Sequence, residues 1–290
     1  MSVRYIVISP VRNEERHIER TIDSVCAQSI KPIRWIIVDD GSSDGTPAII
    51  SERAKSHDWI VLLRRPDRGF YDLDGGGEIK AFLNGYECVK GWDYDYLVKL
   101  DGDVSFNEAY FEDLFDEFEA NPKLGIASGG CYHLIANRLV LEKSYKCHPR
   151  GAGRVYRRRC WEEIEGVVES VGWDAMDVYK ARMLGWEACH FEAIRIIHHV
   201  RTGSKDGLVH DLRRGGRISY LIGCHPIFFL LVGLKRMFMA PFVAGGLAYL
   251  WGYLGASVKN EERIVDLNLM NFIRKEQVGR IKRALSFRVR

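Results

Sequence analysis

The stretch YLVKLDGDVSF, residues 96–106, joins a run of apolar residues to two aspartates one residue apart, Asp101 and Asp103. The apolar run predicts a buried strand, and the DGD sequence predicts a turn at its end. Two carboxylates this close repel each other unless a positive charge lies between them. Carboxylate oxygens at a strand end can hold a hard divalent cation, so the stretch predicts either a metal site or a solvated turn.

An EF-hand calcium loop is a third interpretation, because Glu112 stands at the twelfth loop position counted from Asp101. An EF-hand requires glycine at the sixth position, where this chain has Phe106. It is also entered from a helix, whereas an apolar strand pattern precedes Asp101. The sequence therefore disfavours an EF-hand.

Predicted strands and helices alternate around this stretch. Buried strands are expected at residues 5–10, 34–39, 59–65 and 94–104, and helices at 13–28, 46–56, 75–91 and 107–122, with Asn13 as a candidate cap of the first helix. Such alternation predicts an α/β fold with a mostly parallel sheet and helices on both faces. Ligands of such sheets bind at the carboxyl ends of the strands, where this chain has polar residues at 10–14, 39–40 and 101–103.

Composition narrows the class of protein. The chain has 290 residues, enough for a large α/β domain with an appendage, and 47% of them are hydrophobic. A net charge of +3 gives no overall case for nucleic-acid binding. The seven cysteines contain no C-x-x-C pair, which favours free, mostly buried thiols in a reducing compartment. The first residues read as a buried strand rather than a signal peptide.

Three motifs follow three predicted strands in order: PVRNEE, VDDGSSDGT and KLDGDV. Together they resemble the family 2 glycosyltransferases, which are inverting enzymes with the GT-A nucleotide-sugar fold. The resemblance extends over roughly residues 3–218, and VDDGSSDGT is its most specific part. It implies a GT-A catalytic domain at residues 1–218, followed by a C-terminal helical region at residues 219–290.

The resemblance also implies a role for each matching residue in binding the nucleotide. Pro10, Asn13 and Glu14 would line the nucleotide pocket. Asp39 or Asp40 would accept a hydrogen bond from the base or the ribose. These two aspartates could also cap a turn around residues 41–43, and the two roles are compatible.

The same resemblance assigns the metal. Asp101 would contact the ribose or the metal, and Asp103 would bind Mg²⁺ or Mn²⁺. A histidine after the segment IRII would complete the metal or diphosphate site, with His199 preferred and His198 next. Arg201 would contact the departing diphosphate, together with Lys205. A purely structural histidine at a strand end is the alternative.

An inverting transfer requires a general base that accepts the proton of the acceptor hydroxyl. In the family this base is an acidic residue at the start of a helix, eleven residues before a glycine. Asp174 lies eleven residues before Gly185, and Asp177, the second candidate, lies eight before it. The alternative role of Asp174 is to cap its helix. A basic run at residues 143–159 could contact the acceptor or could be a solvated face.

The composition changes after residue 218. Residues 237–258 contain no charged residue and could just span a bilayer as a helix, although Pro241 and the pair Gly245-Gly246 interrupt them. Residues 259–290 carry nine basic and four acidic residues, which favours the cytoplasmic side for this tail and for the catalytic domain alike. We therefore expect in-plane or re-entrant helices at the cytoplasmic face of the cell membrane.

The tail itself predicts a basic amphipathic helix. Its apolar positions fall roughly on one face and consist of Met270, Ile273, Val278, Ile281 and Leu285. The alternative is that the C-terminal helices pack on the globular domain or on a second subunit.

The sequence thus predicts a membrane-associated inverting glycosyltransferase. It would move a sugar from a nucleoside diphosphate sugar to a hydroxyl of a lipid-linked or polysaccharide acceptor. One rival is a sugar nucleotidyltransferase, which the lack of a glycine-rich loop in SPVRNEERH disfavours. The other is a non-catalytic polysaccharide- or membrane-binding relative, which the acidic residues at the expected positions disfavour.

Overall fold

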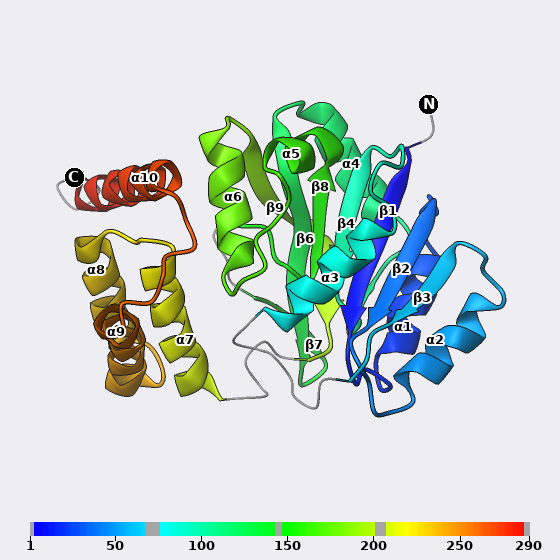
Figure 1. Ribbon diagram of the computed structural model, residues 1–290, viewed down its shortest axis with the longest axis horizontal. Coiled ribbons are helices and arrows are strands. Elements are labelled where there is room, and N and C mark those ends of the chain that lie inside the picture. The colour runs from blue at the N-terminus through cyan, green and yellow to red at the C-terminus, as the bar shows by residue number, and fades with distance from the viewer. Residues whose placement is uncertain (1–2, 68–75, 143–146, 201–206, 287–290) are drawn as a thin grey trace. The chain divides into compact units, whose positions relative to one another are not determined.

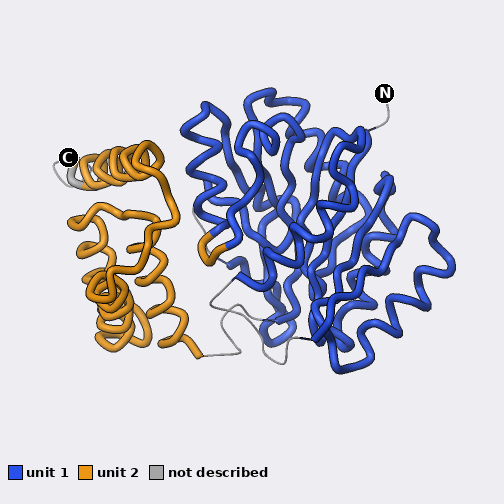
Figure 2. The backbone as a smooth tube through the Cα atoms, viewed as in Figure 1, with its two compact units in different colours: residues 1–169, 173–201 blue, residues 170–172, 202–290 orange. Residues whose placement is uncertain are grey.

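A computed structural model describes residues 3–67, 76–142, 147–200 and 207–286. The chain divides into two compact units, residues 1–169 with 173–201 and residues 170–172 with 202–290 (Figure 2). The predicted boundary between residues 218 and 219 falls inside helix α7 (Leu208–Leu221), which belongs to the second unit. Arg201 and Lys205 lie outside the described residues.

The first unit is built on one mixed sheet, which Figure 1 shows with helices on both sides. Within the described residues its strands are β1 (Tyr5–Val11), β2 (Arg34–Asp39), β3 (Ile60–Arg64), β4 (Tyr96–Leu100), β5 (Val104–Phe106), β6 (Leu124–Ile135), β7 (Arg138–Leu141), β8 (Gly153–Arg157) and β9 (Glu187–His198). Their order is β3-β2-β1-β4-β8-β6-β9-β5, and β7 pairs with β6.

The parallel arrangement holds where strands alternate with helices. β1 pairs in parallel with β2 and β4, and β2 pairs in parallel with β3. The later strands mix the two directions: β8 is antiparallel to β4 and β6, whereas β6 and β9 are parallel. The carboxyl ends of β1, β2 and β4 therefore lie at one edge of the sheet, as the sequence predicted.

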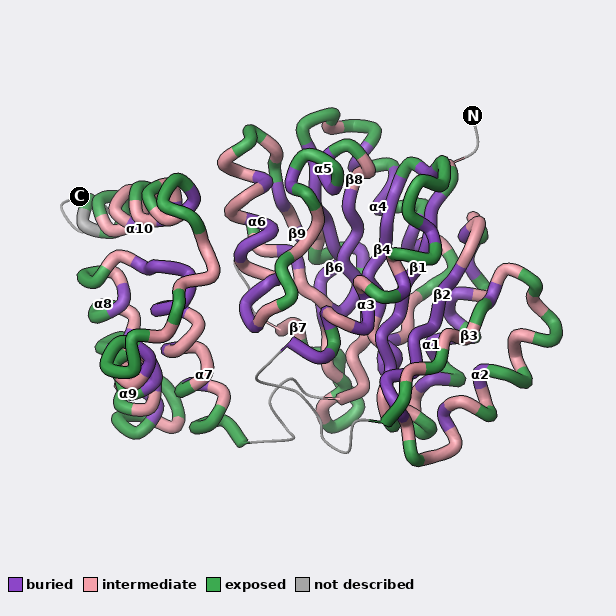
Figure 3. The backbone as a smooth tube through the Cα atoms, in the orientation of Figure 1, coloured by how far each residue is buried: buried purple, intermediate pink, exposed green. Residues whose placement is uncertain are grey.

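Alternate residues of β1 enter two different cores. Tyr5 and Val7 belong to a core packed against α1 and α4, whereas Ile6 and Ile8 belong to a core packed against α3, α5 and α6. The helices of this unit are α1 (Ile18–Cys26), α2 (Thr46–Ala54), α3 (Gly77–Glu87), α4 (Tyr110–Ala120), α5 (Arg158–Glu163) and α6 (Trp173–Met183). A strand covered on both faces needs apolar residues at every position, which is why the run YIVI is continuous. Figure 3 shows these buried strands inside the more exposed helices.

The first helix begins later than its sequence suggested. α1 starts at Ile18 with His17 at the cap position, so the expectation that Asn13 caps this helix is wrong. Asn13 instead adopts a left-handed backbone, φ +55°, which asparagine tolerates better than most residues. Residues 13–17 thus precede the helix, and Asn13 lies against the loop that follows β2.

The second unit consists of helices α7, α8 (Pro226–Arg236), α9 (Phe242–Val258) and α10 (Leu267–Ser286) in its described part. The tail segment does form a helix, but its buried positions differ from the predicted apolar face: Leu269, Ile273 and Gln277 are buried, whereas Met270, Val278 and Ile281 are only partly buried. Gln277 accepts a hydrogen bond from the His225 backbone N–H (2.7 Å). Among the described residues, no helix combines the length and apolar character that a membrane crossing requires.

Helix α3 approaches the sheet more closely than a side chain would allow. A Cβ atom on Gly85 would lie 2.7 Å from Ile8 Cγ2 and 2.8 Å from Val38 Cγ2. Glycine at this position thus lets α3 lie directly on β1 and β2.

The variant Gly85→Ala is expected to lower the free energy of unfolding by about 1–3 kcal/mol, because the added methyl group overpacks this contact. Thermal unfolding followed by circular dichroism measures the change. The control is Gly255→Ala in α9, whose Cβ would meet no described atom within 4 Å, and which is expected to leave stability unchanged or raise it by up to about 1 kcal/mol. Equal stability of Gly85→Ala and the unaltered chain would contradict the packing argument.

Candidate functional site

The loops after β1 and β2 are tied together by polar side chains. Asn13 accepts a hydrogen bond from the Ser43 N–H (2.9 Å), and its own N–H donates to Ser42 Oγ (2.9 Å). The Glu14 N–H donates to Thr46 Oγ1 (2.8 Å), at the start of α2. The motif residues of PVRNEE and VDDGSSDGT therefore meet in space.

The two aspartates of VDDG occupy different surroundings. Asp39 is fully buried, and its Oδ1 accepts a hydrogen bond from the Ser42 N–H (3.0 Å), which is the predicted turn. Its Oδ2 is buried and accepts no hydrogen bond from the described residues, while Arg64 Nε lies 3.6 Å away. Asp40 forms an ion pair with Arg65 (3.0 Å). A buried carboxylate oxygen at a strand end suits a ligand that donates a hydrogen bond.

The DGD turn packs tightly against β1 and α1. A Cβ atom on Gly102 would lie 2.7 Å from Val11 Cγ1 and 3.5 Å from Glu14 Cγ. The buried Thr21 side chain of α1 lies within hydrogen-bond distance of the Gly102 and Val104 carbonyl oxygens, at 2.9 and 2.8 Å. These contacts fix the turn that separates Asp101 from Asp103.

Lys99 supplies a positive charge beside Asp101 and next to Glu78 of α3. This β4 residue is buried, and its ammonium group forms ion pairs with Glu78 of α3 and with Asp101. It also lies 5.4 Å from the ring centroid of Trp173, the first residue of α6. Burial alone would lower the pKa of Lys99, but the charges of Asp101 and Glu78 raise it above the usual value. Lys99 therefore remains a cation in the interior.

Asp101, Asp103 and His198 form a compact group whose ligand atoms lie within 4.8 Å of one another. His198 Nε2 is 3.1 Å from Asp103 Oδ2. Burial raises the pKa of Asp101 to about 6, with Lys99 opposing the rise and the carboxylates of Glu78 and Asp103 adding to it. Two carboxylates and an imidazole at this spacing fit a divalent cation such as Mn²⁺ or Mg²⁺.

The protonation states of His198 and Asp103 follow from their contacts with each other. Burial alone would lower the pKa of His198, but its hydrogen bond to Asp103 raises it to about 11. Burial likewise opposes ionisation of Asp103, but the hydrogen bond from His198 and its charge lower the pKa of Asp103 below the usual value. The imidazolium and the carboxylate thus stabilise each other.

The histidine beside the aspartates is His198, one residue before the preferred candidate His199. His198, the second candidate, lies against Asp103, whereas the preferred His199 points to Ser105, with Nε2 2.9 Å from Oγ. The His199 ring stacks on that of His17, with centroids 5.8 Å apart. The His199 N–H donates to the Asp103 carbonyl (2.9 Å), which extends the antiparallel pairing of β5 with β9. Strand pairing therefore decides which of the two adjacent side chains faces the carboxylates.

The two candidate general bases, Asp174 and Asp177, differ in how far they are exposed to solvent. Asp177 is fully buried and accepts hydrogen bonds from Arg154 Nη1 (2.8 and 2.6 Å) and from the Tyr156 hydroxyl (2.5 Å). Asp174 lies in the first turn of α6, and 43% of its side chain is exposed. Burial opposes its ionisation, but His148, 3.8 Å away, and Arg154 lower the pKa of Asp174 below its usual range. Of the two, only the Asp174 carboxylate can reach a molecule in solution.

The basic run contributes to the fold. Arg154 and Arg157, both from β8, donate to the carbonyl oxygens of Asp174 (2.9 Å) and Leu124 (3.0 Å). Arg150 forms an ion pair with Glu142. The other described members, residues 158 and 159, pair with glutamates one turn later in α5. The described arginines of this run thus form ion pairs or hydrogen bonds within the first unit.

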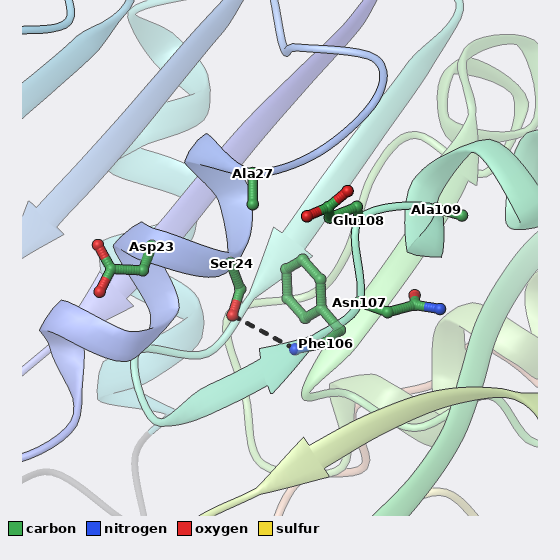
Figure 4. Close-up of a pocket in the computed structure, with 7 residues that line it drawn as sticks. All are labelled: Asp23, Ser24, Ala27, Phe106, Asn107, Glu108 and Ala109. Carbon is green, nitrogen blue, oxygen red and sulfur yellow. Dashed lines mark hydrogen bonds between the residues drawn. The ribbon is translucent and has the colours of Figure 1, made fainter.

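A surface depression of about 630 Å³ lies elsewhere on the unit (Figure 4). It is lined by Asp23, Ser24, Ala27, Phe106, Asn107, Glu108 and Ala109. None of the residues predicted for nucleotide or metal binding is among them. Its hydrogen bond between the Phe106 N–H and Ser24 Oγ (3.4 Å) joins α1 to the end of β5.

Sequence reasoning missed two contributors to this site. Lys99 stood inside the apolar strand pattern, where a cation two residues before Asp101 was a usable signal. Glu78 stood in a glycine-rich helix entry, and nothing local connects it with Lys99. The Glu78–Lys99 contact depends on the packing of α3 against the sheet.

Comparisons with known sequences find one protein family and several synthases that are similar to this chain. The family model described as Glycosyl transferase family 2 matches residues 6–144. Poly-beta-1,6-N-acetyl-D-glucosamine synthase of Staphylococcus epidermidis is 32% identical over 117 residues, which cover 40% of this chain and 26% of that synthase. Polyprenol monophosphomannose synthase of Mycolicibacterium smegmatis is 30% identical over 191 residues, which cover 59% of this chain and 68% of that synthase. The chain thus spans about a quarter of the first relative and two thirds of the second.

Solved structures share the fold. Mannosyltransferase PcManGT from Pyrobaculum calidifontis, in complex with GDP-Man and Mn²⁺, has a TM-score of 0.56 at 16% identity and covers all of this chain and 81% of that one. S. aureus TarS 1–349, in complex with UDP, has a TM-score of 0.54 at 14% identity, with 89% and 72% covered. At these identities the likeness concerns the fold.

Asp177 and Asp174 are expected to differ in their effect on stability. Asp177→Ala leaves the Arg154 guanidinium buried without its carboxylate, and we expect a loss of about 3–5 kcal/mol. Asp174→Ala removes a partly exposed charge in the first turn of a helix and is expected to cost about 1 kcal/mol or less. Urea unfolding of both variants measures the difference, and equal losses would contradict the assignment of Asp177 to the core.

Proposed function

Because this chain belongs to glycosyltransferase family 2, we propose that it transfers a sugar from a nucleoside diphosphate sugar to the hydroxyl of an acceptor. The observation that carries the proposal is the group of Asp101, Asp103 and His198 at the carboxyl end of β4. The buried Asp39 at the end of β2, which β1 separates from β4 in the sheet, supports it, since that carboxylate can accept a hydrogen bond from the base or ribose. Pro10, Asn13 and the Glu14 backbone stand at the end of β1, beside it.

Asp101 and Asp103 are the proposed ligands of a divalent cation, with His198 the third side chain in reach. Bound Mn²⁺ or Mg²⁺ would neutralise the charge that develops on the departing diphosphate. Lys99 holds Asp101 in place from inside the fold, and His198 holds Asp103. The mannosyltransferase PcManGT, whose structure holds GDP-Man and Mn²⁺, supports this class of donor and metal.

Asp174 is the proposed general base. The acceptor oxygen attacks the anomeric carbon from the face opposite the diphosphate, and Asp174 accepts the hydroxyl proton as the new bond forms. The bond from the anomeric carbon to the diphosphate oxygen breaks, its electron pair leaves with the nucleoside diphosphate, and the configuration inverts. The lowered pKa of Asp174 keeps the carboxylate ionised, so its oxygens are unprotonated when the acceptor binds.

We further propose that the acceptor is lipid-linked and that the second unit binds the cytoplasmic face of the membrane. One face of α8 exposes Ile227, Leu230, Leu231 and Leu234, at helical spacing. α9 exposes a similar stripe, and the turn between the two helices exposes Phe238, 83% accessible. The exposed Lys235 adjoins these side chains. Apolar helix faces beside basic residues suit an anionic lipid surface, and the relative named for polyprenol points to the same kind of acceptor.

Donor binding is expected to depend on metal. We expect UDP or GDP to raise the thermal unfolding temperature in the presence of Mn²⁺ but far less in its absence, because a bound ligand stabilises the folded state by mass action. Asp103→Asn should abolish the Mn²⁺-dependent part, whereas the control Asp113→Asn on the outer face of α4 should keep it. No shift with UDP, GDP or dTDP under any condition would contradict the proposed donor site.

Transfer is expected to depend on Asp174. Asp174→Asn should lower kcat by about 10²–10⁴-fold, the usual contribution of a positioned base, with little change in the Mn²⁺-dependent nucleotide shift. Release of nucleoside diphosphate from UDP- or GDP-sugars, with a polyprenyl phosphate acceptor, measures the rate. A variant as active as the unaltered chain would rule out Asp174 as the base.

Membrane binding is expected to require the exposed apolar residues. A double variant, Phe238→Ser with Trp251→Ser, should reduce co-flotation with phosphatidylglycerol vesicles at least about 10-fold, since each large buried apolar side chain contributes about 1.5–3 kcal/mol. Leu134→Ser is the matched control, because Leu134 is 59% exposed but lies in the first unit. Equal flotation of both variants would contradict the proposed docking surface.

A further inference from the structure

A second group of metal-ligating side chains lies on the other side of the His198 ring. Its members are Cys131, His133, Glu142 and His198, whose ligand atoms all lie within 4.8 Å of one another. Cys131 and His133 are two residues apart on β6 and so point to the same face of the sheet. The Glu142 N–H donates to the Cys131 carbonyl (2.8 Å), which places Glu142 beside them at the end of β7.

We propose that these four residues form a zinc site, distinct from the oxygen-rich site of Asp101 and Asp103. A thiolate, two imidazoles and a carboxylate are the ligands that Zn²⁺ prefers, whereas Mg²⁺ and Mn²⁺ favour oxygen. Ligand atoms around tetrahedral zinc lie roughly 3.3–3.6 Å apart, given zinc–ligand bonds of about 2.0–2.3 Å. Here His133 Nε2 lies 3.4 Å from Glu142 Oε2, and Cys131 Sγ lies 3.9 Å from His198 Nδ1.

The hydrogen bonds of His133 favour a cation between it and Glu142. His133 Nδ1 lies 3.1 Å from the His198 carbonyl oxygen, which can only accept, so Nδ1 carries a proton and donates it. A backbone carbonyl that orients an imidazole in this way is the usual outer partner of a metal-binding histidine. In the neutral ring, Nε2 then presents a lone pair to a carboxylate oxygen, an arrangement that a proton or a metal ion must bridge.

One carboxylate oxygen of Glu142, Oε2, faces the other three side chains of the cluster. Arg150 pairs with Glu142 Oε1 and orients the group. Glu142 Oε2 is inaccessible to solvent and accepts no hydrogen bond from the described part of the chain. Cys131 is likewise buried, 2% exposed. A buried carboxylate oxygen without a donor is costly unless a cation compensates it.

The two sites share one imidazole. With Nδ1 of His198 bound to zinc, its Nε2–H donates to Asp103 Oδ2, across the observed 3.1 Å. This carboxylate–histidine–zinc arrangement fixes the tautomer of His198 and the orientation of Asp103. Zinc would thus link the β6–β7 hairpin to the nucleotide-binding carboxylates.

The metal content of the 290-residue chain tests the proposal without any nucleotide or sugar. We expect one equivalent of zinc per chain by mass spectrometry after purification without chelator and dialysis. Co²⁺ added to chelator-treated protein should give a thiolate-to-cobalt charge-transfer absorption that saturates at one equivalent. Zinc that is not retained, together with no such absorption in the unaltered chain, would overturn the proposal and leave a proton alone between His133 and Glu142.

Variants separate the two sites. Cys131→Ser should lose the charge-transfer absorption, and His133→Gln should weaken Co²⁺ binding at least 10-fold. The control Cys88→Ser removes an exposed thiol on the far end of α3 and should leave the absorption unchanged. Asp101→Asn, which leaves the Asp103–His198 contact in place, should keep the absorption while losing the Mn²⁺-dependent nucleotide shift, so that failure of either site is recognised separately. Charge transfer that persists in Cys131→Ser would overturn the assignment, and circular dichroism shows whether each variant is folded.

Discussion

The buried ammonium group of Lys99 is the interaction on which the site depends. Its removal from water costs several kcal/mol, and this cost is offset only because Glu78 and Asp101 supply opposite charges in the interior. These partners come from α3 and from the turn after β4, and the Trp173 ring of α6 lies 5.4 Å from the ammonium. One cation therefore joins the helix that covers the sheet, the carboxylate pair, and the helix that carries Asp174.

His198 plays the corresponding part on the opposite side of the carboxylates. Its ring lies between Asp103 and Cys131, with one nitrogen directed to each. A single side chain thus couples an oxygen-rich group to one that contains sulfur. The coupling arises because β9 ends beside both the DGD turn and β6, through antiparallel pairing with β5 and parallel pairing with β6.

The elements of the first half could be predicted because their signals are local. Apolar strands followed by polar turns marked the carboxyl ends of β1, β2 and β4, and the structure gathers them at one sheet edge. The helix start at Ile18 could not be predicted this way, since the side chain of the expected cap, Asn13, accepts a hydrogen bond from the loop after β2 instead of capping α1. The spacing to Gly185 favoured Asp174 over Asp177 as the base, but the burial of Asp177 was beyond the sequence, because it depends on which carboxylate meets Arg154 in the core.

By itself, the sequence determined the fold class and the family, and it marked Asp101 and Asp103 as the pair that could hold a cation. Short-range spacing carries that information, because strand periodicity and turn chemistry act over a few residues. Only the tertiary structure decided that Lys99 is shared between Asp101 and Glu78, that His198 rather than His199 faces the aspartates, and that Cys131, His133 and Glu142 lie behind that ring. Those choices rest on strand register and helix packing between segments tens of residues apart, where a shift of one residue turns a side chain to the other face.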